Sequence, residues 1–466
     1  MSRRVELHSL TIKDASELIR KKKVSPLDLV ESTLDRIGRI ENRVNAFVTV
    51  MRDEALQSAR HAEGEIRRGF YRGPLHGIPV AVKDLVDTAG TRTTSGSKVR
   101  ADYVPKKDAA VIERLRAAGA VIIGKTVTYE FAYVSVKSPT RNPWNLDRQP
   151  GGSSAGSGAA VSSGMCLAAI GTDTGGSIRV PSCFNGIVGL KPTYGLVSKR
   201  GVTTLAWTMD HVGPMTKTVE DAAIVLNVIA GFDRADPASI DFSHPDYTRS
   251  LRESVSHLRL GVPTNYFFER IDPEVEGAFR ESIEVLRKLG AEIREIEIPL
   301  LEHTMGAEFT IIAAEATAYH EKSLRSKARL YDQEVRMFLE LGELLPSRYY
   351  LKAQRVRGLI KTAIEGALKS VDLIVTPTSP VAPARLGQEE FRFEGVKENV
   401  LYAYVRNCCP FNLAGIPAVS VLCGFTHENL PIGLQIAGRA FDEAMVLQVA
   451  YAYESATDWH LRNPPI

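Results

Sequence analysis

The sequence predicts an α/β fold, in which a central mixed β-sheet is covered by helices on both faces. Short apolar segments, typical of buried strands, alternate along the chain with segments of helical periodicity. The 466 residues are 44% hydrophobic, so the chain can bury a large core. No internal repeat or linker divides it. We therefore expect a single large domain over residues 1–466.

The first predicted elements are helical. Ser25 and Pro26 supply an N-cap and a proline at the first helical position, followed by apolar residues at helical spacing. An apolar run over 78–82 then predicts a buried strand whose end presents Lys83. A helix over 108–118 and a second buried strand over 120–123 follow.

The centre of the chain, residues 150–201, is dominated by small residues. It contains the stretches GGSSAGSGAAVSSG and GTDTGGSIRVPS, with apolar segments at 165–170 and 187–190 between and after them. Glycine and serine permit close backbone approach and unusual dihedral angles. The composition alone fits two interpretations equally well. The segment is either a functional site built from main-chain groups or a region of tight packing without such a site.

Beyond Val219, amphipathic helices alternate with strands, as expected for a sheet with helices on both faces. The predicted strands are 258–262, 291–298, 373–376, 418–422 and 432–436. The predicted helices are 273–289, 308–323, 347–369 and 442–455.

The charge balance excludes several classes of partner. Lys and Arg number 58 against 55 Asp and Glu, a net charge of +3 without a basic face, so no direct contact with nucleic acid is expected. No apolar run is long enough to span a bilayer, and the first residues, MSRRVELHSLTIKDASEL, are too polar for a signal peptide. We expect a cytoplasmic protein that does not bind membranes.

The cysteines and histidines indicate no metal site. The cysteines are odd in number and form no CxxC pair, which argues against both a disulfide framework and a zinc site. We expect Cys408 and Cys409, which lie in an apolar stretch, to be small buried hydrophobes. His211 is expected to have a structural role. The five cysteines are Cys166, Cys183, Cys408, Cys409 and Cys423.

Three short motif matches fail on their context. Residues 119–126 fit the phosphate-loop pattern, but their middle reads AVII, which is a strand and not a flexible loop. Residues 152–156 fit GxSxG, but the preceding NPWNLDRQP cannot form the strand that a nucleophile elbow requires. Residues 95–98 fit SxxK, which needs a helix, whereas TAGTRTTSGSK is turn-forming.

A fourth match covers nearly the whole chain. Residues 151–192 resemble the core of the amidase signature family, and PLHGIPVAVKD, DHVGPMTKTVEDAA, FNLAGIPAVSV and LPIGLQIAGRAFDE agree with it in the same order. The resemblance implies the amidase signature fold, with the catalytic core at about 75–215. It also implies hydrolysis of amide C–N bonds without a metal or organic cofactor.

The resemblance further implies a catalytic triad. Ser177 matches the nucleophile, Ser153 the bridging serine and Lys83 the base, and the peptide bond between Gly152 and Ser153 is expected to be cis. The lysine can accept a proton only when it is neutral, and desolvation lowers a lysine pKa enough to allow this. We expect the neighbouring Asp84 to point outward or to pair elsewhere.

Further residues follow from the same resemblance. The expected oxyanion hole consists of the backbone N–H groups of Thr174, Gly175, Gly176 and Ser177. The expected supporting residues are Ser154, Asp173 and Arg179. Tyr133 and Trp207 are expected in the acyl pocket, with Arg406, Asn407 and Tyr319 as weaker candidates.

Two members of the family fit the sequence. The first is a free-standing amidase that acts on a small-molecule amide. The second is the ammonia-releasing subunit of a glutamyl-tRNA(Gln)/aspartyl-tRNA(Asn) amidotransferase, whose source of ammonia is glutamine. The N-terminal half resembles that subunit, but YVRNCCPF before Asn412 lacks the acidic residue expected to hold glutamine, and residues 126–136 lack the expected small residues. The departures favour the free-standing amidase. The sequence specifies neither the amide nor the oligomeric state, and a homo-oligomer is compatible with it.

Overall fold

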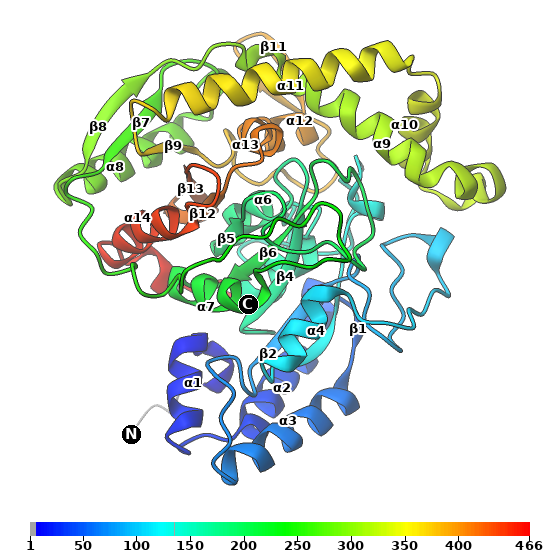
Figure 1. Ribbon diagram of the computed structural model, residues 1–466, viewed down its shortest axis with the longest axis vertical. Coiled ribbons are helices and arrows are strands. Elements are labelled where there is room, and N and C mark those ends of the chain that lie inside the picture. Colours follow the sequence, from blue (N-terminus) through cyan, green and yellow to red (C-terminus); the bar gives the residue numbers. More distant parts are fainter. Residues whose placement is uncertain (1–5, 135) are drawn as a thin grey trace.

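A mixed sheet of 11 strands runs through the computed structural model, which describes residues 6–134 and 136–466 (Figure 1). The strand order is β1-β3-β2-β4-β6-β5-β12-β13-β9-β7-β8. The strands are β1 (Phe47–Val50), β2 (Pro79–Lys83), β3 (Val121–Thr126), β4 (Ala168–Asp173), β5 (Val188–Lys191), β6 (His211–Thr216), β7 (Arg259–Pro263), β8 (Glu292–Ile296), β9 (Leu373–Pro377), β12 (Ala418–Phe425) and β13 (Pro431–Ala437).

Both faces of this sheet are covered by helices. One face carries α1 (Ile12–Arg20), α4 (Ala110–Ala117), α7 (Val219–Ile229), α8 (Pro273–Lys288) and α14 (Glu443–Ser455). The other carries α2 (Pro26–Val44), α3 (Arg52–Arg67), α5 (Ala155–Ser162) and α6 (Arg179–Asn185). A further group, α9 (Thr304–Lys327), α10 (Gln333–Glu343), α11 (Ser347–Ala367) and α13 (Cys409–Ala414), packs together at one end (Figure 1). The short helix α12 (Val400–Val405) follows a hairpin of β10 (Glu390–Phe393) and β11 (Val396–Asn399).

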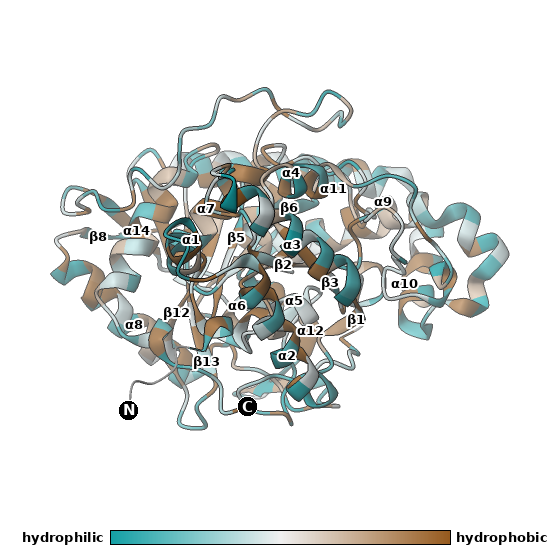
Figure 2. Cartoon of the chain, turned by 90° about the horizontal axis from the view of Figure 1, so that it is seen from below, coloured by the Kyte–Doolittle hydropathy of each residue, from teal (hydrophilic) through white to brown (hydrophobic). Residues whose placement is uncertain are grey.

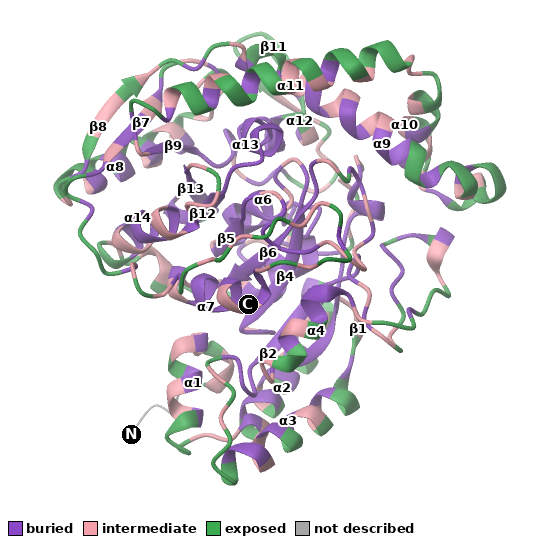
Figure 3. Ribbon diagram, in the orientation of Figure 1, coloured by how far each residue is buried: buried purple, intermediate pink, exposed green. Residues whose placement is uncertain are grey.

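The alternation of side chains along each strand explains the two layers. Val80 and Val82 of β2 pack into the apolar cluster of α1, α4 and α7, whereas Ala81 between them packs into the cluster of α2, α3 and α5. Both faces are therefore buried, which is why the strand sequence is continuously apolar. Figures 2 and 3 show the same distribution, with buried strands at the centre and hydrophilic, exposed residues on the outer faces of helices such as α3.

The predicted fold class is confirmed. The predicted strands are present, although β3 continues to Thr126, and the long helices lie where their periodicity indicates. Ser25 caps α2 in a capping box with Asp28, and Pro26 begins the helix. The sequence did not indicate β1, β6, α10 or the β10–β11 hairpin. In the described part of the chain, no helix is long and apolar enough to cross a membrane. Residues 1–5 of the polar N-terminal segment, and Ser135 within 126–136, lie outside the described residues.

A buried carboxyl group joins helix α1 to helix α7. Asp221 of α7 is fully buried, and its two oxygens accept the backbone N–H groups of Ile12 (3.0 Å) and Lys13 (3.1 Å) at the start of α1. The first N–H groups of a helix have no partner within the helix, so a side chain more than two hundred residues away supplies the cap.

We predict that Asp221→Ala lowers the free energy of unfolding by about 1–3 kcal/mol, because two buried N–H groups lose their acceptors. Urea unfolding followed by circular dichroism measures the change. Glu31→Ala, on the exposed side of α2, is the control and should change the free energy of unfolding by less than about 0.5 kcal/mol. Equal midpoints for the two variants would contradict the prediction.

Candidate active site

The Gly/Ser-rich segment folds around the end of strand β4. Strands β2 and β4 are parallel neighbours, so Lys83 and Asp173, their last residues, lie at the same edge of the sheet. Ser153 precedes α5 and Ser177 precedes α6, and these two helices pack against each other. The fold thus gathers these residues from three separate segments of the chain.

Lys83 is fully buried and lies within hydrogen-bond distance of two hydroxyl groups. Its Nζ donates to Ser153 Oγ (2.8 Å) and to Thr172 Oγ1 (2.8 Å). Burial lowers the pKa of Lys83 to about 7, although the nearby carboxyl groups of Asp173 and Asp210 act in the opposite direction. At neutral pH a large fraction of this amine is therefore unprotonated and able to accept a proton.

Asp84 does not compete for this lysine. Its Oδ2 accepts the backbone N–H (2.9 Å) and the hydroxyl (2.6 Å) of Thr94. The carboxyl is fully buried, and burial raises its pKa. The expectation that Asp84 pairs elsewhere is confirmed.

The two serine segments are joined by main chain. The peptide bond between Gly152 and Ser153 is cis, as expected, and the N–H of Ser154 donates to the carbonyl oxygen of Ser177 (3.3 Å). Ser153 is buried, whereas Ser177 is half-buried and lines a cavity. The proton path from Ser177 to Ser153 stays a prediction.

The loop between β4 and α6 is held by Asp173. One carboxylate oxygen accepts the N–H of Gly176 (2.8 Å) and the other accepts the N–H of Ile178 (3.1 Å). The guanidinium of Arg179 donates to both oxygens, each at 3.0 Å. Burial alone would raise the pKa of Asp173. The guanidinium of Arg179 outweighs this effect and holds the pKa well below its usual range. Asp173 is therefore an ionised carboxylate inside the protein.

Further polar groups complete this cluster. Nη1 of Arg179 donates to Gln435 Oε1 (2.7 Å), Nη2 donates to Asn412 Oδ1 (2.5 Å), and Asn412 Nδ2 donates to Asp173 Oδ1 (2.8 Å). All four side chains are fully buried. Asn412 and Gln435 lie in stretches that carry the family resemblance, yet no local pattern indicated what they contact.

The structure corrects one expected oxyanion donor. The N–H of Gly176 donates to Asp173 and is not available to a substrate oxygen. This glycine has a φ of +125°, and a Cβ there would stand 2.9 Å from the Cβ of Cys408, so a side chain does not fit. The N–H groups of Thr174, Gly175 and Ser177 have no acceptor among residues 6–134 and 136–466.

The cavity at Ser177 is lined mainly by apolar side chains. Tyr133 is part of this wall, as expected for an acyl pocket. Glu308 of α9 also lines this cavity, and the sequence analysis did not identify it. Helical spacing could have indicated that it is buried, since Glu308 lies three and four residues before Ile311 and Ile312 on the buried face of α9. The remaining lining residues are Ala132, Val134, Thr174, Gly175, Leu205, Phe309, Ile312, Leu401, Val405 and Cys409.

Trp207 is not brought into this cavity. Its side chain is 45% exposed, and its carbonyl oxygen accepts the hydroxyl of Tyr194 (2.5 Å). A larger cavity of about 650 Å³ adjoins the Ser177 cavity, because Val134 and Leu401 line both.

The weaker candidates also lie away from this cavity. Arg406 forms an ion pair with Glu398, and Asn407 donates to the carbonyl oxygens of Phe267 and Pro377. Tyr319 lines a separate cavity.

His211 and the cysteines have the structural settings expected of them. His211 is buried, with Nδ1 3.1 Å from the carbonyl oxygen of Asp173, and burial lowers its pKa well below the usual value. The five cysteines are buried thiols.

Comparison with known proteins identifies similar sequences and folds along the whole chain. The family model described as Amidase matches residues 28–447. An amidase of Pseudomonas putida is 43% identical over 99% of this chain and 98% of that protein. A glutamyl-tRNA(Gln) amidotransferase subunit of Carboxydothermus hydrogenoformans is 41% identical over 99% of this chain and 100% of that protein. A crystal structure of an amidase superposes with a TM-score of 0.87 at 34% identity, covering 96% of this chain and 99% of that one.

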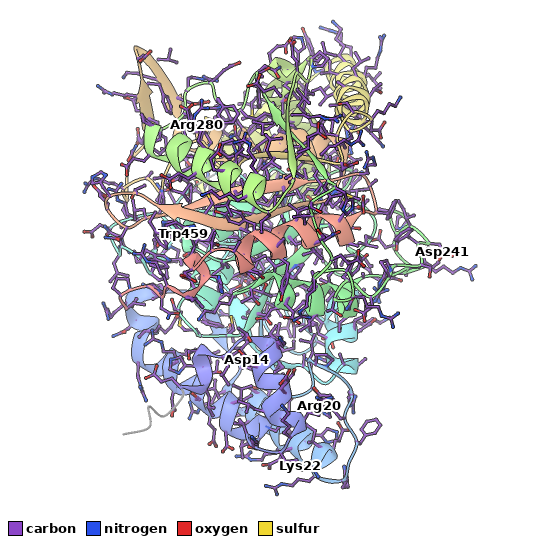
Figure 4. The ribbon with its side chains drawn as sticks, turned by 90° about the vertical axis from the view of Figure 1, so that its left-hand side faces the viewer. Asp14, Arg20, Lys22, Asp241, Arg280 and Trp459 are labelled. Atoms are coloured by element: carbon purple, nitrogen blue, oxygen red, sulfur yellow. The ribbon has the colours of Figure 1, made fainter. Side chains whose placement is uncertain are left out.

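We predict that Arg179→Met lowers the free energy of unfolding by about 3–5 kcal/mol, because it leaves the carboxylate of Asp173 buried without its cation. Chemical unfolding followed by tryptophan fluorescence measures the loss. Arg280→Met removes an ion pair with Glu276 on the solvent side of α8 and is the matched control (Figure 4). The control should unfold like the wild type, since exposed ion pairs contribute little. A wild-type midpoint for Arg179→Met would refute the role given to this pair.

Proposed function

The chain belongs to the amidase signature family and is a hydrolase that cleaves amide C–N bonds, and from this premise we propose that Ser177, Ser153 and Lys83 carry the reaction. The observation that supports this assignment best is the 2.8 Å hydrogen bond between the fully buried Lys83 and Ser153. A hydroxyl becomes a useful nucleophile when a neighbouring base removes its proton, and an unprotonated lysine is such a base.

In the proposed reaction, the oxygen of Ser177 attacks the amide carbonyl carbon while its proton passes to Ser153, whose own proton passes to Lys83. The C–N bond of the resulting tetrahedral intermediate then breaks. Lys83 returns its proton to Ser153, and the proton of Ser153 passes to the leaving nitrogen, which needs it because an amine anion is too basic to leave unaided. Water attacks the acyl-enzyme by the same route, releasing the acid and restoring Ser177.

The negative charge of the intermediate requires fixed donors. We assign this role to the N–H groups of Thr174, Gly175 and Ser177, which are free among the described residues. Ser154, Asp173 and Arg179 act as positioning residues. Their hydrogen bonds hold the loop on which these donors lie.

We propose a free-standing enzyme that acts on a small-molecule amide. In the segment before Asn412, the residues that reach the Ser177 cavity are Leu401, Val405 and Cys409, so the acidic residue expected in this segment to hold glutamine is missing. The similarity to amidotransferase subunits makes ammonia release from glutamine within a complex the alternative.

The unpaired thiols support a reducing compartment such as the cytoplasm. The continuous sheet supports residues 1–466 as one catalytic domain.

We predict that Ser177→Ala lowers amide turnover by about a thousandfold or more, while its thermal unfolding matches the wild type. A panel of primary amides, anilides and peptide amides, assayed for ammonia and amine release, measures this. The purified wild-type chain alone should hydrolyse at least one of them. Wild-type rates in Ser177→Ala would refute the assignment of the nucleophile, and glutamine hydrolysis that requires co-purifying subunits would favour the alternative.

We further predict that kcat/KM rises with pH through about 7, the value to which burial lowers the pKa of Lys83. Below that pH the amine is protonated and cannot accept the proton of Ser153, and above it the amine is free. Lys83→Arg keeps a cation at every accessible pH, so it should remain inactive even in alkaline buffer. The pH profile of kcat/KM for both proteins is the measurement. A flat wild-type profile across neutral pH would count against Lys83 as the base.

A further inference from the structure

Glu308 is a buried carboxyl group without a hydrogen-bond partner in the described part of the chain. It lies on α9, its side chain is fully buried, and neither oxygen has a hydrogen-bond partner within residues 6–134 and 136–466. It lines the same cavity as Ser177. A buried polar group left unpaired destabilises a protein, so both oxygens require a partner that the described residues do not supply.

The carboxyl group stands directly beside the loop that carries Ser177. Its Oε1 lies 3.0 Å from the point where a Cβ on Gly175 would stand, so the glycine is what leaves room for it. Cys409 is packed against the same glycine from α13. A substrate with its carbonyl carbon at Ser177 and its acyl chain in the cavity would therefore bring that chain close to Glu308.

Burial, more than the surrounding charges, favours the neutral form of Glu308. Burial raises its pKa well above the usual range, with the carboxylate of Asp173 acting in the same direction. The cations of Arg357, Arg179 and Lys191 oppose this but do not reverse it. Arg357 itself is engaged elsewhere, donating to the carbonyl oxygens of Leu413 and Thr208. A neutral carboxyl group presents one O–H donor and one carbonyl acceptor side by side.

We propose that Glu308 is a specificity-determining residue that binds a carboxamide or ureido group on the acyl part of the substrate. Such a group offers one C=O acceptor and one N–H donor, which match the two oxygens of a protonated carboxyl in a pair of parallel hydrogen bonds. The inference rests on the proposed function of Ser177, because it takes the Ser177 cavity to be the acyl pocket. An aliphatic acyl group would leave Glu308 unpaired in the complex as well.

The test compares pairs of amides that differ in one terminal group. The diamides of malonic, succinic and glutaric acid are matched with monoamides in which an isopropyl group replaces the second carboxamide. For at least one chain length, the wild type should prefer the diamide in kcat/KM by at least about tenfold, because the isopropyl analogue leaves the carboxyl unpaired. Glu308→Leu should abolish this preference. Glu308→Gln should retain it, since a glutamine amide also presents one donor and one acceptor.

Two results of this kinetic comparison would overturn the proposal. The first is a diamide preference that is missing in the wild type or unchanged in Glu308→Leu. The second concerns a third analogue of the same chain length, in which a terminal amino group replaces the second carboxamide. A wild-type preference for this analogue that is lost in both Glu308→Leu and Glu308→Gln would indicate an ionised carboxylate that binds a cation.

A binding measurement separates this proposal from the assignment of Ser177. Calorimetry with the Ser177→Ala protein should show tighter binding of the preferred diamide than of its isopropyl analogue, and Glu308→Leu added to Ser177→Ala should remove the difference. Equal affinities in the Ser177→Ala protein would overturn the proposal. If Ser177→Ala turned amides over at wild-type rates but showed the binding difference, the nucleophile assignment would fail and the role of Glu308 would stand. Thermal unfolding of Glu308→Leu at or above the wild-type midpoint shows that the variant is folded.

Discussion

The buried ion pair between Asp173 and Arg179 is the interaction on which the site depends. It joins the last residue of β4 to the first residue of α6, so the loop between them, with Ser177, has little freedom. Because Asp173 also accepts the N–H groups of Gly176 and Ile178, the direction of the loop backbone is set by one carboxylate. Asn412 and Gln435 satisfy the remaining groups, which is what makes a charge pair tolerable at this depth.

Burial shapes the chemistry of two groups of opposite type. It lowers the pKa of Lys83 and raises that of Glu308, so both side chains are driven toward their neutral forms. A neutral amine can accept a proton, and a neutral carboxyl can both donate and accept a hydrogen bond. The low polarity around Ser177 thus serves the proposed catalysis and the proposed selection of substrate through one physical effect.

The local sequence pattern predicted the features that depend on residues close together in the chain. The apolar run before Lys83 indicated a buried strand end, and the resemblance placed Ser153 and Ser177 beside it. Contacts between distant segments could not be predicted in this way. The sequence does not reveal that Thr172 contacts Lys83, or that the N–H of Gly176 turns toward Asp173. The burial of Glu308 could have been predicted, since its spacing from Ile312 places it on a buried helix face.

The groups proposed to break the bond all come from the first half of the sequence, whereas the residues that line the cavity come from both halves. Lys83, Ser153 and Ser177 precede β5, whereas α9, α12 and α13 supply much of the wall opposite Ser177. Substitutions in the second half could therefore retarget the enzyme while the bond-breaking machinery is inherited unchanged. A lineage built in this way can widen its range of amides without reinventing its reaction.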